Sequence, residues 1–310
     1  GMYRRVELFE KPVFVHRAQA MCYAYIFALQ NNMETIGIQM TYCNLETEQT
    51  KYFREEFSFE EIKKWFDDLM EEYGKWATFQ CEMKNQRQTS IKELNFPFEY
   101  RPGQKKLVLD VYRTIMRQKL LFMQAPTGVG KTISTIFPAV KAVGEELADR
   151  IFYLTAKTIT ATVAKETFVL LEKNGYRAKT IQITAKEKLC LCDEMECNPV
   201  TCPYAKGHFD RVNDAVFDLL HRCEMIERDD ILSQADRYSV CPFELCLDTA
   251  SWCDNIICDY NYVFDPNVYL KRFFQEGIKG DYIFLIDEAH NMVERSRQMY
   301  SAQIYKERSE

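Results

Sequence analysis

The sequence predicts an α/β fold with a doubly wound, mainly parallel sheet, a small α+β unit ahead of it and a cysteine-rich, mostly helical insertion within it. From residue 98 onward, short uninterrupted apolar runs alternate with longer helical stretches. This alternation is typical of parallel strands covered by helices on both faces. Polar residues follow each run, at the edge where such sheets place their ligands. The predicted strands are 120–124, 150–155, 180–184, 255–258 and 282–287.

Residues 1–84 predict a separate α+β unit. A helical apolar stripe in residues 16–30 is followed by an alternating strand, 36–43, and its hairpin partner, 51–57. Ser58 should begin a second helix, because Glu61 completes a capping box with it. The expected buried face of that helix consists of Ile62, Trp65, Phe66, Leu69 and Tyr73.

The remaining boundaries follow from changes in pattern. Residues 85–97 are polar and aperiodic, which predicts a linker. The main α/β domain should comprise residues 98–189 and 253–310, because the alternation of strands and helices stops between them. Residues 190–252 are therefore expected to form the cysteine-rich insertion.

Composition limits the class of protein. Hydrophobic residues make up 47% of the 310 residues, and no apolar run reaches the roughly 18 residues of a membrane helix. The N-terminus has no signal-peptide pattern, so we expect a cytoplasmic protein without a membrane partner. In a reducing compartment the 12 cysteines indicate metal binding or catalysis rather than disulfides.

Charge is unevenly distributed along the chain. The formal net charge is −6, but residues 101–190 hold 16 Lys and Arg against 7 Asp and Glu, a net +9. A local basic stretch is sufficient to follow a phosphate backbone, whatever the total charge. The alternative is an ordinary solvated basic face.

A phosphate-binding loop follows the first predicted strand. In "QAPTGVGKT" (124–132), Gly128 and Gly130 allow the backbone to approach phosphate closely, and the helix that follows offers its N-terminus. Lys131 would contact the β- and γ-phosphates of ATP, and the Thr132 hydroxyl would ligate Mg²⁺. Ala125 stands where the strict pattern has Gly. The expected ATP-binding residues of the loop are Pro126, Thr127, Gly128, Val129, Gly130, Lys131 and Thr132.

The second half of the ATP site is expected in "FLIDEAH" (284–290), at the end of another buried strand. Asp287 would hold Mg²⁺, and Glu288 would orient and deprotonate the attacking water. His290 would sense the γ-phosphate. An acidic helix cap is the alternative interpretation of these residues. Upstream, Arg101 and Gln104 precede the first helix of the domain, and the Gln104 carboxamide can pair bidentately with adenine.

The loop, the "DEAH" sequence and the cysteines between them resemble the XPD/DinG family of superfamily 2 iron–sulfur DNA helicases, over residues 98–310. The resemblance implies a RecA-like domain that hydrolyses ATP and moves 5′→3′ along single-stranded DNA, at DNA junctions, in repair or replication. "YLTAKT" (153–158) is similar to a family motif in which Thr155 and Lys157 would touch DNA, and Lys186 would line the DNA route. A second RecA-like domain, expected beyond residue 310, would be the partner within a longer chain.

The resemblance also implies a [4Fe–4S] cluster held by Cys190, Cys197, Cys202 and Cys241, which are separated by 6, 4 and 38 residues. Four thiolates at irregular spacing suit an iron–sulfur cluster better than zinc, which prefers C-x₂-C pairs. Zinc and a metal-free site remain the alternatives, and Cys192 competes with Cys190 as the first ligand. Cys223, Cys246, Cys253 and Cys258 are expected to be thiols of the core.

Gln19 and Tyr23, spaced as Q-x₃-Y on the first predicted helix, resemble the C-terminal part of a PD-(D/E)XK nuclease of the RecB type. The metal-binding carboxylates of that family are not in the chain, so this unit is expected not to cut DNA by itself. Three functions remain open: half of a DNA helicase that is inactive or weakly active alone, a zinc-stapled ATPase switch or scaffold, and an ATP-regulated DNA nuclease.

Overall fold

The computed structural model describes residues 10–126, 128–156 and 158–302, and the chain divides into two compact units, residues 1–82 and 83–310. Each unit has its own hydrophobic core. Among the described residues, no helix is both long enough and apolar enough to cross a membrane.

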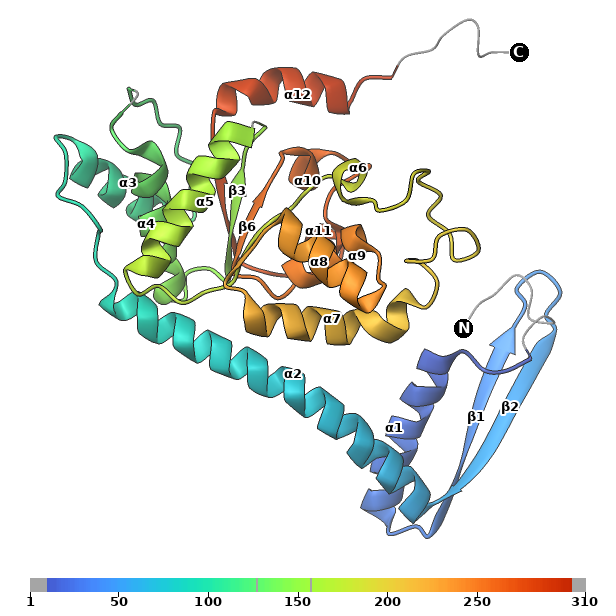
Figure 1. Cartoon of the computed structure of the whole chain (residues 1–310). Coiled ribbons are helices and arrows are strands. Elements are labelled where there is room, and N and C mark those ends of the chain that lie inside the picture. The colour runs from blue at the N-terminus through green and yellow to red at the C-terminus, as the bar shows by residue number, and fades with distance from the viewer. Residues whose placement is uncertain (1–9, 127, 157, 303–310) are drawn as a thin grey trace, which may run out of the picture. The chain divides into compact units, whose positions relative to one another are not determined.

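The N-terminal unit packs one helix on a two-stranded antiparallel sheet (Figure 1). Alternate residues of the first strand, Ile38, Met40 and Tyr42, are buried against Met21 and Ala24 of the helix. The predicted helix and hairpin are therefore confirmed. The elements are α1 (Phe14–Asn31), β1 (Thr35–Cys43) and β2 (Thr50–Ser58).

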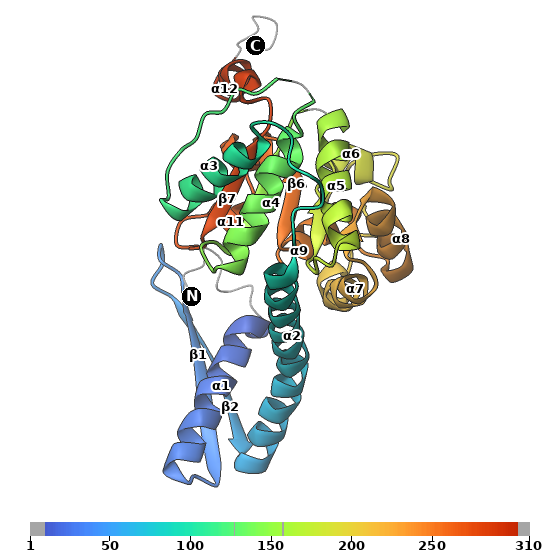
Figure 2. The same cartoon turned by 90° about the vertical axis from the view of Figure 1, so that its left-hand side faces the viewer.

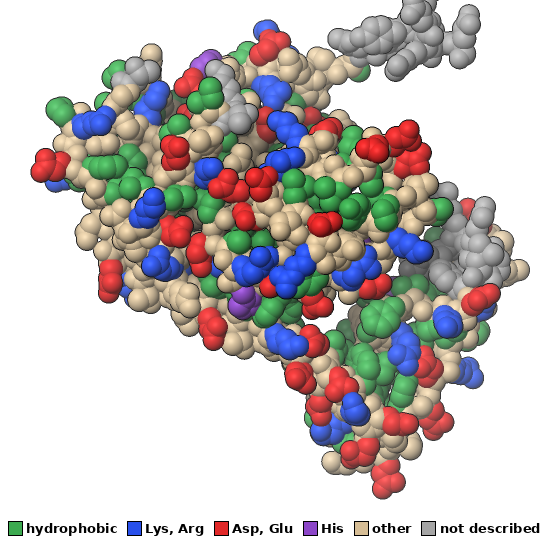
Figure 3. Space-filling view, viewed as in Figure 1, with side chains coloured by type: hydrophobic (Ala, Val, Ile, Leu, Met, Phe, Trp, Pro, Cys, Tyr) green, Lys and Arg blue, Asp and Glu red, His purple; other side chains and the backbone are tan. Residues whose placement is uncertain are grey.

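Helix α1 is apolar on two sides. One side forms the core of the unit, while Tyr23, Ile26, Phe27 and Leu29 are exposed on the other. The space-filling view shows apolar side chains gathered over this helix (Figure 3). A helix that is apolar all round is usually covered on both sides.

The second helix, α2 (Phe59–Glu93), begins as predicted but is much longer. Ser58 and Glu61 form the expected capping box, with Ser58 N donating to Glu61 Oε2 at 2.8 Å. Ile62 is fully buried, whereas Leu69 and Tyr73 are exposed, so the predicted buried face is wrong at those two positions.

An irregular linker is also the wrong prediction for residues 85–93, which are helical. This stretch lacks Gly and Pro and is rich in Lys, Gln, Arg and Glu, which favour helix even where no apolar period is visible. Tertiary contacts add to this preference. Ile91 is buried in the core of the second unit, and the Arg87 guanidinium pairs there with Asp254.

The second unit contains a five-stranded sheet in the order β5-β4-β6-β3-β7, and every neighbouring pair is parallel. Both faces are covered, which confirms the predicted doubly wound α/β fold. The strands are β3 (Arg150–Leu154), β4 (Thr180–Gln182), β5 (Met225–Ile226), β6 (Asn255–Cys258) and β7 (Tyr282–Ile286).

Alternate residues of β3 face opposite layers. Ile151 and Tyr153 belong to the core formed with α4 and α5, and Figure 2 shows α3 and α4 in front of the sheet. Phe152 packs on the other face against Phe273 and Phe274. The helices named here are α3 (Gln104–Met116), α4 (Lys131–Gly144), α5 (Thr158–Lys173) and α11 (Lys271–Phe274).

One predicted strand is absent from this sheet. Residues 120–124 have no regular structure, and Leu120 and Phe122 are 88% and 89% exposed. An apolar run becomes a strand only where a neighbouring strand pairs with it. Here the run pairs with no described strand, and β7 ends the sheet order. The prediction of a buried strand ahead of the phosphate loop is therefore wrong for this structure.

The cysteine-rich segment is mostly helical, as predicted, but it is not separate from the sheet. Its short strand β5 pairs in parallel with β4, with Thr180 opposite Met225. A two-residue strand is too short to show a sequence period. The remaining elements are α6 (Lys186–Leu189), α7 (His208–Arg222), α8 (Arg228–Tyr238), α9 (Pro242–Ala250), α10 (Asn261–Phe264), η2 (Ala289–Asn291) and α12 (Met292–Met299).

Candidate functional site

The glycines of the phosphate loop adopt conformations that other residues rarely adopt. Gly128 has φ +86° and Gly130 has φ +75°, both left-handed. A Cβ on Gly130 would lie 2.8 Å from Gln104 Nε2. Helix α4 begins at Lys131 immediately after the loop, so its first N–H groups, with Thr132 in the first turn, lie where a phosphate would bind. Thr127 lies outside the described residues.

Arg101 and Gln104 contact this loop from the preceding segment. Gln104 is buried; its Nε2 donates to Val129 O at 3.1 Å, and its Oε1 accepts from Arg101 N at 3.0 Å. The Arg101 guanidinium donates to Gly128 O. Both residues thus belong to the candidate nucleotide site, but the Gln104 carboxamide bonds to backbone groups of the chain. Recognition of adenine by Gln104 remains a prediction.

The carboxylates of the "DEAH" sequence follow β7. Asp287 N donates to Leu154 O at 3.0 Å, which extends the pairing of β7 with β3 by one residue. Asp287 Oδ1 accepts from Glu288 N at 3.1 Å, and Glu288 is left-handed with φ +49°. His290 Nδ1 lies 3.4 Å from Glu288 Oε2, with the imidazole largely exposed. The Tyr260 hydroxyl donates to Asp287 O, so it fixes the main chain of this turn.

Tyr153 connects the two halves of the site. Its phenol lies near both Thr132 and Asp287. Tyr153 is almost fully buried, and this burial, with the nearby Asp287 charge, raises the pKa of its hydroxyl. The hydroxyl therefore stays protonated and able to donate. The sequence did not single out Tyr153 or Tyr260, because no local pattern shows which group a tyrosine hydroxyl will contact.

The three residues expected at DNA are placed differently from one another. Thr155 is buried, and its hydroxyl bonds to that of Thr160, so this side chain does not face solvent. Lys157 lies outside the described residues. Lys186 begins α6, and its Nζ lies 5.9 Å from the centre of the Phe243 ring, beside the cysteines.

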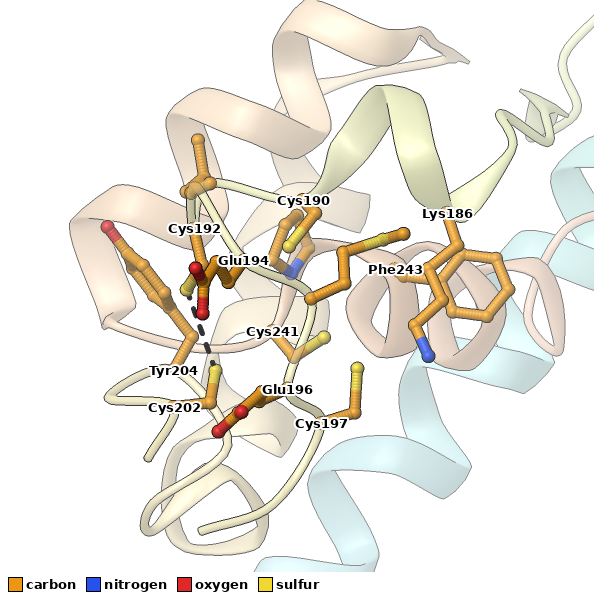
Figure 4. Close-up of a pocket in the computed structure, with 13 residues that line it drawn as sticks. Lys186, Cys190, Cys192, Glu194, Glu196, Cys197, Cys202, Tyr204, Cys241 and Phe243 are labelled. Atoms are coloured by element: carbon orange, nitrogen blue, oxygen red, sulfur yellow. Dashed lines mark hydrogen bonds between the residues drawn. The ribbon is translucent and has the colours of Figure 1, made fainter. Parts of the chain in front are cut away.

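Five cysteines line one pocket, shown in close-up in Figure 4. The Cys192 and Cys202 sulfur atoms are 3.8 Å apart. The backbone N–H of Cys241 donates to Nδ1 of buried His208 at 3.2 Å, and this hydrogen bond fixes the main chain at Cys241. The pocket thus brings together all four predicted ligands and Cys192: Cys190, Cys192, Cys197, Cys202 and Cys241.

The pocket offers thiols, the donor type that both zinc and iron–sulfur clusters use, but these side chains do not converge on one point. Among residues 10–302, apart from the two gaps, no three His, Cys, Asp or Glu side chains converge closely enough to hold one metal ion. Structural zinc requires four donors on one ion. An iron–sulfur cluster spreads four thiolates over four irons, so its ligands need only surround a common space.

The cysteines assigned to the core are mostly confirmed there. Cys246, Cys253 and Cys258 are buried, and none of them lines the pocket. Burial raises the pKa of the Cys246 thiol to about 12, so it stays protonated. Cys223 is only half-buried.

Comparison with known proteins gives a consistent result. A DEAD_2 family model matches residues 164–308. The regulator of telomere elongation helicase 1 homolog of Caenorhabditis elegans is 21% identical over 64% of this chain and 24% of that protein. The general transcription and DNA repair factor IIH helicase subunit XPD/RAD3 of Saccharomyces cerevisiae is 23% identical over 64% of this chain and 29% of its own length.

Two solved structures show weak likeness to the chain. An XPD helicase has a TM-score of 0.45 and 20% identity over 63% of this chain and 34% of that one. A truncated XPD has a TM-score of 0.41 and 18% identity over 61% and 53%. The sequence comparisons, by themselves, make the chain similar to XPD-like superfamily 2 helicases over about two-thirds of its length, and the chain spans less than a third of the length of the curated relatives named above.

Proposed function

We propose that this chain is the nucleotide-binding half of an ATP-dependent DNA helicase of the XPD type. The observation that carries the proposal is that Thr132, in the first turn of α4, and Asp287, directly after β7, both lie near the same buried tyrosine, Tyr153. Two side chains suited to Mg²⁺ at a phosphate-binding helix N-terminus fit phosphoryl transfer. The similarity to helicase subunits of repair and telomere proteins supports the same class.

The chain's own residues then have distinct roles in the proposed reaction. The loop backbone and Lys131 bind the β- and γ-phosphates, and Thr132 and Asp287 hold Mg²⁺. The ion, when bound, neutralises charge on the phosphate oxygens. Glu288 orients the attacking water and accepts its proton, and His290 next to it responds to the γ-phosphate.

DNA and a second RecA-like domain are the proposed partners. The net +9 charge of residues 101–190 supports contact with a DNA backbone. We propose 5′→3′ movement along single-stranded DNA and action at junctions, with the second domain closing over the nucleotide. The chain alone is expected to bind ATP weakly and hydrolyse it slowly.

Equilibrium binding of Mg·ATP to the 310-residue chain tests the proposal. Lys131→Ala should weaken binding by at least about tenfold, because it removes a charged hydrogen bond worth about 1.5 kcal/mol or more. Lys106→Ala changes an exposed lysine of the same unit and should have no effect. No binding by the unmodified chain, or equal loss in both variants, would contradict the proposal.

We further propose a [4Fe–4S] cluster held by Cys190, Cys197, Cys202 and Cys241, with Cys192 in the same pocket as the competing first ligand. The donor set supports it. When bound, the cluster would stabilise a loop-rich segment that has few apolar residues of its own. Lys186, beside it, is proposed to line the DNA route.

Iron and acid-labile sulfide, measured after anaerobic purification, distinguish the cluster from zinc. Cys197→Ser should lose both, while Cys81→Ser, at an exposed cysteine far along the chain from the pocket, should lose neither. Zinc in place of iron would favour an ATPase switch or scaffold that does not translocate. Equal metal content in the unmodified chain and Cys197→Ser would rule out Cys197 as a ligand.

The N-terminal unit supports a second candidate function, an ATP-regulated nuclease. Gln19 and Tyr23 are both exposed on α1, one helical turn apart, and this exposure supports the candidate function. As a remnant, the unit should leave single-stranded DNA intact in Mg²⁺ or Mn²⁺. Cleavage that disappears in Gln19→Ala would instead indicate an active nuclease.

A further inference from the structure

The turn that carries Glu288 has a backbone conformation that needs support. Glu288 has φ +49° and ψ +46°, in the left-handed region. This region is unfavourable for a residue with a side chain, and it persists only where surrounding contacts hold it. Within the turn, Glu288 N donates to Asp287 Oδ1 at 3.1 Å, and Glu288 O accepts from Asn291 N at 2.9 Å. Because backbone conformation sets the direction of a side chain, whatever holds this turn also orients the Glu288 carboxylate.

Tyr260 supports the turn from outside it. Tyr260 follows β6 by two residues, and its hydroxyl donates to Asp287 O and lies 3.4 Å from Glu288 O. These two carbonyls belong to the peptide groups on either side of Glu288. A hydroxyl that contacts both of them therefore opposes rotation of φ and ψ at Glu288.

Tyr260 is itself held in place. Its side chain is fully buried, and Tyr260 O accepts from Val263 N and Phe264 N at 3.0 Å each. The preceding residue, Asp259, accepts two hydrogen bonds from the Arg295 guanidinium, at 2.9 and 2.7 Å. Arg295 lies on α12, the helix that follows the turn. The segment that carries Tyr260 is thus joined both to the turn and to the helix after it.

Asp287 and Glu288 depend on Tyr260 to different degrees. Asp287 N donates to Leu154 O at 3.0 Å, so the pairing with β3 also holds the main chain of Asp287. Glu288 lies one residue beyond that pairing. Loss of the Tyr260 hydroxyl would leave Asp287 supported by the sheet and would release mainly Glu288.

We propose that Tyr260 is a positioning residue for ATP hydrolysis: its hydroxyl holds Glu288 in the left-handed conformation from which the carboxylate activates water. This inference rests on the proposed function, in which Glu288 accepts the proton of the attacking water. A general base works only within hydrogen-bond reach of that proton, so a small misplacement lowers the rate. Tyr260 acts through Glu288, so it should affect the rate of hydrolysis and not the affinity for Mg·ATP.

The test is Tyr260→Phe, which removes the hydroxyl and keeps the buried ring. In single-turnover hydrolysis of Mg·ATP by saturating 310-residue chain, the rate should fall about fivefold, as expected for loss of one ordinary hydrogen bond. Mg·ATP affinity, measured by equilibrium binding, should stay unchanged. Tyr176→Phe is the matched control, because this buried tyrosine bonds to Asn255 and not to the turn. It should leave both rate and affinity unchanged.

A double variant shows whether Tyr260 acts through Glu288. Glu288→Gln removes the proposed base, so adding Tyr260→Phe to it should cause no further loss of rate. A fivefold loss that persists in the Glu288→Gln background would overturn the inference, because the hydroxyl would then act on another group.

The other outcomes separate the inference from the proposed function. Equal hydrolysis rates of Tyr260→Phe and the unmodified chain overturn the inference alone. The inference is also overturned if the variant unfolds or loses Mg·ATP affinity, because the hydroxyl then supports the fold or the binding site. If the unmodified chain hydrolyses ATP no faster than Glu288→Gln, Glu288 is not the base, and the inference fails while nucleotide binding stands. Absence of Mg·ATP binding by the unmodified chain would overturn the proposed function itself.

Discussion

Breaking the ion pair between Arg87 and Asp254 should strongly destabilise the second unit. The Arg87 guanidinium donates to Asp254 Oδ1 and to Asp149 O, and Asp254 Oδ2 accepts from Lys179 N at 2.9 Å. The side chains of Arg87 and Asp254 are 10% and 17% exposed. Arg87→Met keeps the apolar stem and removes the charge, so Asp254 is left buried without its partner.

The expected cost is about 3–5 kcal/mol, the usual range when one member of a buried pair is removed. That is a large share of the 5–15 kcal/mol that typically stabilises a domain. Urea unfolding followed by circular dichroism at pH 7 would measure it as a midpoint shift of about 1 M or more. Arg297→Met, at an exposed pair on α12, should change stability by less than about 0.5 kcal/mol.

The pH dependence gives the sharper test. Burial raises the pKa of Asp254, while Arg87 opposes that shift, so removing Arg87 should raise the pKa further. A carboxyl whose folded pKa is raised favours the folded state at low pH and loses that contribution as pH rises. The cost of Arg87→Met should therefore be largest at pH 7 and shrink toward pH 4, near the ordinary Asp value of about 3.9. A cost below about 1 kcal/mol, or one that is the same at both pH values, would refute this reasoning.

Three further predictions concern the loop, the metal site and the helix cap. Gly130→Ala should weaken ATP binding at least about tenfold, because the added Cβ meets Gln104 and the φ of this position is left-handed. The control Gly74→Ala, whose Cβ has nothing within 4 Å, should stabilise α2 by about 0.5–1 kcal/mol. Equal ATP affinities of Gly130→Ala and the unmodified chain in calorimetry would contradict this prediction. Asp287→Asn should bind ATP in EDTA as the unmodified chain does, but its ATP affinity should no longer increase when Mg²⁺ is added. If Mg²⁺ increases the ATP affinity of this variant as much as that of the unmodified chain, Asp287 is excluded as a ligand. Ser58→Ala should cost about 1 kcal/mol in urea unfolding of the N-terminal unit, since it removes the α2 cap, and an unchanged midpoint would show that the cap contributes nothing.

Local pattern predicted much of the fold. The alternation of Ile38, Met40 and Tyr42 predicted β1, and the apolar runs predicted β3, β4, β6 and β7. The same reasoning failed at residues 120–124, where an apolar run has no strand beside it, and at residues 85–93, where helix propensity acts without an apolar period. In both places the deciding contacts come from distant parts of the chain.

For the candidate site, too, the sequence indicated some features and missed others. The motif sequences predicted Lys131, Thr132 and Asp287 as site residues, and the cysteines of residues 190–241 indicated the segment that lines the pocket. Thr155 shows the limit of this approach, because its motif suggested contact with DNA and the fold buries it beside Thr160.

The sequence by itself determined the class of fold, the phosphate loop and the chemical types available for nucleotide and metal, since these depend on local period and residue identity. The tertiary structure alone decided which groups meet: Tyr153 near Thr132 and Asp287, Arg87 with Asp254, and five thiols around one pocket. The physical reason is that strand register and burial join residues far apart along the chain. A local sequence pattern contains no information about contacts between residues that are far apart along the chain.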